Sequence, residues 1–291
     1  MEFLKTSLLL LAGTTTFVSY QFANKQAMGL GAEVLAVTWA ALTFCACIVF
    51  LFMAAGGNAL ELSPKKISRD VLLVAAFMAA GNLLFLFGIS RTSMTNANII
   101  FVATAPLTAI FTSLLNRERL AKRFWLFSLL MLAGAVVASY KGSLTALTPG
   151  DLSVFASTAC IALGNCFSSR ALRRVSSDEL TFWRFLIGSF FLFPVALVFG
   201  NIHGLLGNVD AAAFVAAGSA LFAASVVFFF ILMAAKGAAF ASNVNLLHPG
   251  TSAVLDFAVL GITPSAYQVF GGALVVSAGY KLVRLTDGKK R

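Results

Sequence analysis

The chain of 291 residues is 59% hydrophobic and only 11% charged, and its mean hydropathy is +0.92. A soluble domain presents far more charge to water than this, so the composition excludes an ordinary soluble protein. The formal net charge is +10, which in a soluble chain would suggest a nucleic-acid partner. No basic patch is interleaved with aromatic residues here, so we expect no nucleic-acid partner.

Charge-free runs set the expected architecture. Ten of them follow one another, each 17 to 27 residues long, and about 20 apolar residues carry a helix across the hydrocarbon layer. One such run could be a buried helix of a soluble core, but ten in succession could not. We therefore predict an all-α integral membrane protein with ten transmembrane helices, at about 6–26, 34–55, 70–90, 94–115, 122–141, 151–170, 180–200, 211–235, 238–260 and 264–285.

The first predicted helix carries an unusual number of polar side chains. Thr16, Tyr20 and Asn24 recur every four residues and therefore share one helix face. This polarity and the length of the apolar run argue against a signal peptide. Lys25 lies near the end of the helix, where a lysine usually reaches toward the lipid headgroups. The alternative is that Lys25 faces a path through the membrane and binds an anionic group.

The next helices contain isolated polar groups. Predicted helix 34–55 holds Cys45 and Cys47, whose spacing fits structural thiols rather than a redox motif. Predicted helix 70–90 holds one amide, Asn82. An amide in hydrocarbon either bonds a neighbouring helix or faces a watery cavity.

Predicted helix 94–115 begins with the stretch NANIIFVATAP. Asn96 and Asn98 point to nearly opposite sides of a helix, so only one of them can face a central cavity. Pro106 removes the backbone hydrogen bond to the carbonyl of Val102 and should kink the helix. A freed carbonyl at that depth is tolerated only against protein or water.

The second half contains two further polar groups, Asn165 in predicted helix 151–170 and Arg184 in predicted helix 180–200. Arg184, like Lys25, either reaches toward the headgroups or faces the path and binds an anion.

The stretch NVNLLHP, in predicted helix 238–260, resembles the earlier stretch at an offset of 147 residues. Here Pro249 removes the hydrogen bond to the carbonyl of Asn245. One face of this predicted helix carries a polar stripe that consists of Asn245, His248, Ser252 and Asp256. The stripe favours Asn245 as the residue that faces a central cavity, and the repeat then favours Asn98 for the same position in the first half. Asp256 is the only acid well inside a predicted span, so it either carries a coupling proton or pairs with a cation.

Other matches between the two halves occur at offsets of 144 or 145 residues. They join Phe22 to Phe167, Lys25 to Arg170, Trp39 to Trp183 and Gly134 to Gly279. Each match is weak alone, and a chance alignment of apolar segments is the alternative. The pattern predicts two five-helix units, 1–144 and 145–291, and because five is odd the second unit enters the membrane inverted.

The distribution of positive charge predicts the orientation. With a cytoplasmic N-terminus, 18 of the 21 Lys and Arg residues fall inside, and only Lys25, Arg91 and Lys141 fall outside. Positive charge concentrates on the cytoplasmic side of membrane proteins, so we expect both termini to be cytoplasmic. Anionic lipid headgroups on that side are the expected partners of the basic clusters.

Local motifs resemble a known family. Ala105-Pro106-Leu107, followed by a glutamate within Arg117-Glu118-Arg119-Leu120, is similar to the fourth-helix pattern of the EamA-like branch of the drug/metabolite transporter superfamily. The second half matches the same pattern at Pro249, Gly261, Gln268, Gly271 and Gly279. In the family pattern a glutamate follows this glycine, whereas Ile262 follows Gly261 here. If that glutamate has a structural role, the second half lacks it. The resemblance implies ten helices in two inverted halves and a transport function.

These observations favour a secondary transporter that moves a small polar metabolite, an amino acid or related compound, by alternating access. The expected substrate-binding residues are Asn98, Asn245, His248, Tyr20, Asn24, Asn82, Asn165 and Thr16. The expected gating or coupling residues are Pro106, Pro249, Asp256, Lys25 and Arg184. Enzyme motifs such as Walker A, HExxH and GxSxG are absent, so we expect no catalytic residue, metal or cofactor.

Three alternatives stay open. The dipeptide Asn24-Lys25 is similar to one in the sugar-phosphate and nucleotide-sugar branch, which implies an exchanger of those compounds. A channel would need a continuous polar lining, and an intramembrane enzyme would have to use His248 with Asp256. A monomer in the inner cell membrane is the expected state.

Overall fold

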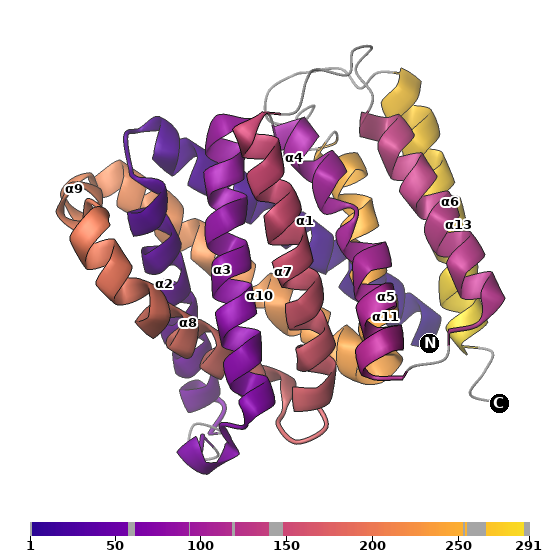
Figure 1. Ribbon diagram of the computed structural model, residues 1–291, viewed down its shortest axis with the longest axis horizontal. Helices are drawn as coiled ribbons and strands as arrows, with labels where there is room; N and C mark the ends of the chain where they lie inside the picture. The colour runs from indigo at the N-terminus through magenta and orange to yellow at the C-terminus, as the bar shows by residue number, and fades with distance from the viewer. Residues whose placement is uncertain are drawn as a thin grey trace.

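The computed structural model describes residues 2–57, 62–92, 94–117, 120–139, 148–252, 254 and 266–287. Regular structure in this part of the chain is entirely helical, which confirms the predicted fold class (Figure 1). The α-helices are α1 Glu2–Gly29, α2 Val34–Ala55, α3 Arg69–Arg91, α4 Met94–Phe101, α5 Thr104–Leu115, α6 Lys122–Ser139, α7 Pro149–Ala171, α8 Ser177–Phe199, α9 Ile202–Gly207, α10 Val209–Lys236, α11 Ala238–Ala241 and α13 Ala266–Asp287. Two 3₁₀ helices, η2 Pro64–Lys66 and η3 Ser242–Leu247, complete the set.

The outer surface of the helical bundle is apolar, as expected for a protein in lipid. Large hydrophobic side chains such as Phe52, Phe199 and Phe270 are mostly exposed, while many amides and hydroxyls are buried. Five described helices, α2, α3, α7, α8 and α10, are long and apolar enough to cross a membrane. Apolar side chains outside and polar groups inside are the reverse of a soluble protein.

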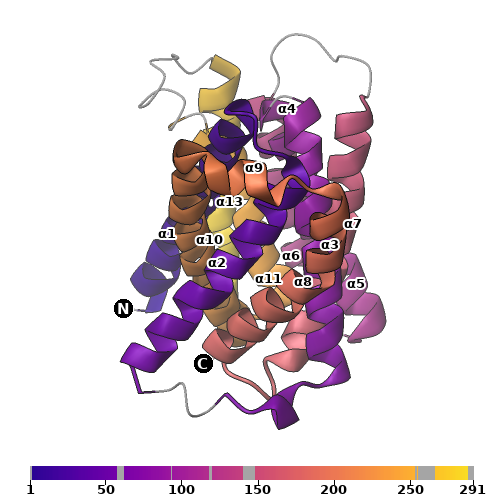
Figure 2. The ribbon, with the colours of Figure 1, turned by 90° about the vertical axis from the view of Figure 1, so that its left-hand side faces the viewer.

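Helices of the first half pack mainly against helices of the second half. The α1 helix packs most extensively on α10, and α3 packs on α7, while α2 pairs with α8 and α6 pairs with α13 (Figures 1 and 2). The first and third helices of one half thus meet the third and first helices of the other. Exchanging the two halves leaves this set of partners unchanged, which is the relation expected of two inverted repeats.

The fourth crossing, which the sequence predicts as a helix over about 94–115 kinked by Pro106, is divided into two helices near its middle. The α4 helix ends at Phe101 and α5 begins at Thr104. The amide of Ala105 donates to the carbonyl of Val102 at 3.2 Å. Pro106 has no N–H group with which to bond the carbonyl of Val102. This carbonyl is nevertheless not free, because the residue before the proline bonds it in the shorter spacing of a 3₁₀ helix.

The ninth crossing, which the sequence predicts as a helix over about 238–260 kinked by Pro249, is also irregular. The chain forms α11, then the 3₁₀ helix η3, and is helical again at 248–252. The amide of His248 donates to the carbonyl of Asn245, so this carbonyl too is bonded by the residue before a proline. Residues 253 and 255–265 lie outside the described residues, and Asp256, Gly261 and Ile262 are among them.

Glycines allow the paired helices to approach closely. A Cβ added at Gly134 of α6 would lie 2.9 Å from the carbonyl oxygen of Gly271 and 3.0 Å from the amide nitrogen of Val275 in α13. The neighbouring Gly272 has no heavy atom within 4 Å of such a Cβ. Small residues at helix contacts are the usual way in which membrane helices associate, since lipid gives no hydrophobic force between them.

We predict that Gly134→Ala lowers the thermal stability of the purified protein in detergent, because backbone atoms of α13 must move to admit the methyl group. Overpacking of this kind costs about 1–3 kcal/mol. Gly272→Ala is the matched control, and its unfolding temperature should stay the same or rise, since alanine favours a helix. Equal unfolding temperatures for the two variants would contradict the α6–α13 contact.

Candidate functional site

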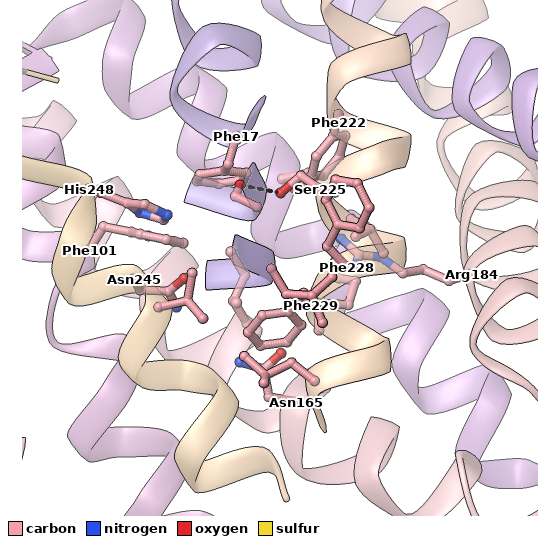
Figure 3. A pocket seen from close by; sticks show the side chains of 18 residues that line it. Phe17, Phe101, Asn165, Arg184, Phe222, Ser225, Phe228, Phe229, Asn245 and His248 are labelled. Carbon is pink, nitrogen blue, oxygen red and sulfur yellow. Dashed lines mark hydrogen bonds between the residues drawn. The ribbon is translucent and has the colours of Figure 1, made fainter. Parts of the chain in front are cut away.

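A pocket lies between the two halves of the chain (Figure 3). Side chains from seven crossings meet there, three from the first half and four from the second. The lining residues are Leu9, Gly13, Phe17, Met78, Asn82, Phe101, Ile161, Asn165, Arg184, Phe222, Ser225, Val226, Phe228, Phe229, Leu232, Val244, Asn245 and His248.

The pocket occupies the middle of the bundle and one side of it. We call the side on which α1 begins the terminus side, and the other the far side; α13 also ends toward the terminus side in Figure 1. Leu9 and Gly13 belong to the terminus-side half of α1, and Ser225 through Leu232 belong to that half of α10. The space open to water-sized molecules is about 60 Å³, which is room for a few waters.

Three asparagine amides line the pocket, one each from α3, α7 and η3. The Nδ2 atom of Asn82 is buried and has no hydrogen-bond partner within the described chain. The Nδ2 of Asn165 donates to Oγ1 of Thr108 at a long distance of 3.4 Å. Asn245 lies in the 3₁₀ helix three residues before His248, a spacing that places both side chains on one face.

His248 sits within a stack of aromatic rings. Its imidazole lies 4.7 Å from the ring of Phe17 and 5.7 Å from the ring of Phe101, in nearly parallel orientation. The Nδ1 atom is buried, and no described residue bonds it. A ring held on its faces but free at its nitrogen can still offer a hydrogen bond to a molecule in the pocket.

Arg184 brings a positive charge to the pocket wall. Its guanidinium lies 5.1 Å from the ring of Phe185, 5.6 Å from Phe222 and 5.7 Å from Phe230. The side chain is only 6% exposed. Within the described residues it forms no ion pair, and its Nε atom has no hydrogen-bond partner.

Ser225 ties two walls of the pocket together. Its hydroxyl donates to the carbonyl of Gly13 at 3.0 Å and so joins α10 to α1 (Figure 3). In Figure 3 the side chains of Phe228 and Phe229 lie between Arg184 and Asn245.

Several predicted site residues of α1 do not line the pocket. Tyr20 stacks on Phe222 with ring centroids 4.1 Å apart. The Nδ2 of Asn24 donates to the carbonyl of Tyr20 at 2.9 Å, and the hydroxyl of Thr16 bonds the carbonyl of Ala12. Lys25 follows Asn24 near the end of α1 and is partly buried.

Asn98 also lies away from the pocket wall, although it touches the predicted polar stripe. Its Nδ2 donates to Oγ of Ser252 at 2.9 Å, which joins the fourth crossing to the ninth. Pro106 and Pro249 border the irregular turns without lining the pocket. Of the thirteen predicted residues, the pocket wall therefore contains Asn82, Asn165, Asn245, His248 and Arg184.

Aromatic residues that line the pocket did not stand out in the sequence. Phe17 lies four residues after Gly13 and three before Tyr20, so the spacing could have placed it on the polar face of α1. Phe228 and Phe229 belong to a run of three phenylalanines, which by itself favours packing. With 29 phenylalanines in the chain, composition alone does not single out those that shape a cavity.

A second, mainly apolar pocket lies to the side of the central one, between α1, α6, α13 and η3. Asn243 belongs to it, two residues before Asn245. The Nδ2 of Asn243 donates to the carbonyl of Ala239 at 3.2 Å. The two asparagines of the NVN motif thus face different spaces.

Comparison with known proteins agrees with this architecture. The model of the EamA-like transporter family matches residues 4–140 and again residues 148–283. The chain is 26% identical over 231 residues to an uncharacterized transporter of Archaeoglobus fulgidus, covering 77% of this chain and 76% of that protein. It is 24% identical over 237 residues to the uncharacterized transporter YyaM of Bacillus subtilis, covering 79% and 77%.

A solved crystal structure shares the fold, with a TM-score of 0.79 and 16% sequence identity over 97% of this chain and 98% of that one. The family match occurs once in each half, in agreement with the repeat seen in the helix pairing. The chain therefore belongs to the EamA-like transporter family of the drug/metabolite transporter superfamily and is a multi-pass membrane protein.

Proposed function

We propose that the protein is a secondary transporter that moves a small polar metabolite, an amino acid or related compound, through the central pocket. The observation that carries the proposal is the pocket itself, which brings three amides, an imidazole and a guanidinium together inside an apolar bundle. Groups of this kind are expensive in a membrane interior and mark substrate paths. Both halves of the chain contribute to the wall, as transport between two inverted units requires.

Unpartnered polar atoms give the pocket its binding capacity. Nδ2 of Asn82 and Nδ1 of His248 are buried without a bond to any described residue. Leaving one such atom unpaired costs about 1–3 kcal/mol, and a polar substrate recovers part of that cost. Asn245 and Asn165 add donors and acceptors to the same wall.

The shape of the pocket supports alternating access. The cavity extends from the middle of the bundle toward the terminus side, while the rings of Phe17, Tyr20, Phe101 and Phe222 pack against one another at its far edge. We propose that these rings close the far side in this conformation, and that the units 1–144 and 145–291 exchange roles to open it. The space open to water-sized molecules is only about 60 Å³, so we propose that the wall moves when a substrate binds.

The irregular turns before Pro106 and Pro249 are the proposed points of movement. Each replaces α-helical hydrogen bonds by shorter-range bonds, which include Ala105 to Val102 in the first half and His248 to Asn245 in the second. Such turns bend more easily than a continuous helix and border the pocket in both halves.

The proposed location is the inner cell membrane, with the terminus side in the cytoplasm. Lys65, Lys66 and Arg69 lie on the terminus side, between α2 and α3 or at the start of α3, where positive charge is expected. Anionic headgroups on that side are the proposed lipid contacts. Under this orientation the pocket opens toward the cytoplasm.

The alternatives fit the pocket less well. Sugar phosphates and nucleotide sugars carry two or more charges, whereas Arg184 is the one Lys or Arg among the described lining residues. A channel needs a continuous polar path, but packed aromatic rings stand at the far edge of the pocket. Uptake into vesicles with analysis of the recovered compound separates transport from chemical conversion.

Asn245→Leu should reduce uptake roughly tenfold or more, because leucine suits the membrane but leaves the substrate without its hydrogen bonds. Uptake is measured in reconstituted vesicles, with labelled compounds chosen by a thermal-shift screen of amino acids and related metabolites. Asn243→Leu makes the same chemical change two residues away, at the lateral pocket, and should transport normally. The opposite result, with only Asn243→Leu inactive, would move the site to the lateral pocket.

Replacing Pro106 or Pro249 by alanine should slow uptake several-fold while leaving membrane insertion intact. Alanine restores the N–H, so a regular α-helical bond can form to the carbonyl of Val102 or Asn245 and stiffen the turn. Pro194 lies within the continuous helix α8, and Pro194→Ala is the control. Wild-type rates in both test variants would show that the turns do not move during transport.

Orientation can be tested by labelling single cysteines in intact cells with a membrane-impermeant maleimide. His203 lies exposed on the far side and Lys65 exposed on the terminus side. In a background without the four native cysteines, His203→Cys should react from outside, and Lys65→Cys should react only after permeabilisation. Reactivity in the reverse order would invert the orientation.

A further inference from the structure

The guanidinium of Arg184 is a buried charge without a counter-ion in the described chain. It lies in the terminus-side half of α8, seven residues after Ser177, and is 6% exposed. The salt bridge found among the described residues, between Lys66 and Glu179, is elsewhere. No Asp or Glu lines the described pocket. An isolated buried cation is strongly disfavoured unless a partner compensates it.

Aromatic contacts account for only part of this compensation. The rings of Phe185, Phe222 and Phe230 stand 5.1 to 5.7 Å from the guanidinium. Such contacts are weaker than the loss of hydration of a full charge, and they leave the N–H groups unbonded. The hydroxyl of Tyr20 and the thiol of Cys45 also interact electrostatically with Arg184, but both are ordinarily neutral. The missing partner must be an acceptor with negative charge.

The position of Arg184 indicates where that acceptor comes from. Figure 3 shows Arg184 on one side of the pocket and Asn245 and His248 on the other. Apolar rings, including Phe228 and Phe229, lie between them. A molecule in the pocket would therefore meet a cation at one end, apolar surface along its body and neutral hydrogen-bonding groups at the other end.

We propose that the substrates are small organic monocarboxylates, whose carboxylate binds Arg184 and whose apolar or aromatic body lies among the phenylalanine rings. The inference rests on the proposed function, because it names the substrate class of the same pocket. A guanidinium presents two parallel N–H groups that match the two oxygens of a carboxylate. A zwitterionic amino acid fits the same description when its ammonium group bonds the amide oxygens of the opposite wall.

The charge of the pocket discriminates between substrate classes. One cation among the described lining residues balances one negative charge, so a phosphate dianion would remain partly uncompensated. A cationic amine without a carboxylate would place a second positive charge near Arg184 and is rejected. The carboxylate end is therefore the required part of the substrate.

Matched probes test the inference by equilibrium binding to the purified full chain, without any transport measurement. They are 3-phenylpropionate, its neutral amide, 2-phenylethylamine, phenylalanine and phenyl phosphate. Tryptophan fluorescence is the readout, because Trp183 precedes Arg184 in α8. The wild-type protein should bind 3-phenylpropionate and phenylalanine at least about tenfold more tightly than the amide, the amine or phenyl phosphate.

Arg184→Gln should weaken binding of 3-phenylpropionate roughly 30-fold or more, as expected for the loss of one partner of a buried charge pair. It should also abolish the preference over the amide. Arg184→Lys keeps the charge and should restore part of the preference, which separates a lost charge from a misfolded protein. Arg173→Gln removes an equal charge from an exposed position and should bind like the wild type.

Three results would overturn the inference: unchanged binding in Arg184→Gln, equal binding of amine and carboxylate, or tighter carboxylate binding in Asp256→Asn. The last result would mean that Asp256 neutralises Arg184 within the chain. Uptake in vesicles then distinguishes the two proposals. Carboxylate binding through Arg184 without uptake would support this inference and refute transport. Uptake of cationic amines that depends on Asn245 would support transport and refute this inference.

Discussion

Peptide groups inside a bilayer have no water to bond, so each must find a partner within the protein. A continuous helix meets this constraint automatically, and a proline within it does not. In this protein the constraint is met twice in the same way. Ala105 bonds the carbonyl of Val102, and His248 bonds that of Asn245. Both turns stay satisfied while interrupting the helix, and the central pocket lies beside them.

Close helix contacts hold the frame around these turns. Gly134 brings α6 against α13, and Gly88 brings α3 against Gly150 of α7. Large side chains either lie exposed on the outer surface, like Phe199, or are buried in the core, like Phe185. Each main contact joins one half of the chain to the other. The pocket wall can therefore be built from both halves, with a rigid pair of helices on either side of the irregular crossings.

The sequence was most informative where one physical requirement decides the outcome. Crossing a hydrocarbon layer needs a long apolar run, so the helical class and the repeated halves could be predicted. Local irregularity depends on neighbours: Pro194 lies within the continuous helix α8, whereas crossings with Pro106 and Pro249 are broken. No single-residue rule distinguishes these prolines. The helix bounds differ by a few residues for a similar reason, since caps such as Ser176 with Glu179 extend them.

The site was predicted in part, because helical spacing fixes which residues share a face but not which face meets a cavity. Asn245 and His248 line the pocket together, while Asn98 instead bonds Ser252. Tyr20 and Asn24 lie on the far side of the cavity, beyond Phe17. The aromatic residues were missed because apolar side chains in a membrane protein have many other uses. Only the fold separates those that face the cavity from those that face lipid.

The fixed charge of Arg184 has an energetic consequence for the working cycle of the carrier. Under the proposed mechanism, the empty site carries one positive charge, and a bound monocarboxylate makes it neutral. A membrane voltage acts on a charge that changes sides, by about 2.3 kcal/mol per 100 mV for a complete crossing. The voltage would then bias the return of the unloaded site and leave the loaded step nearly unaffected. An unpaired arginine would in this way couple the direction of net flux to the polarity of the cell.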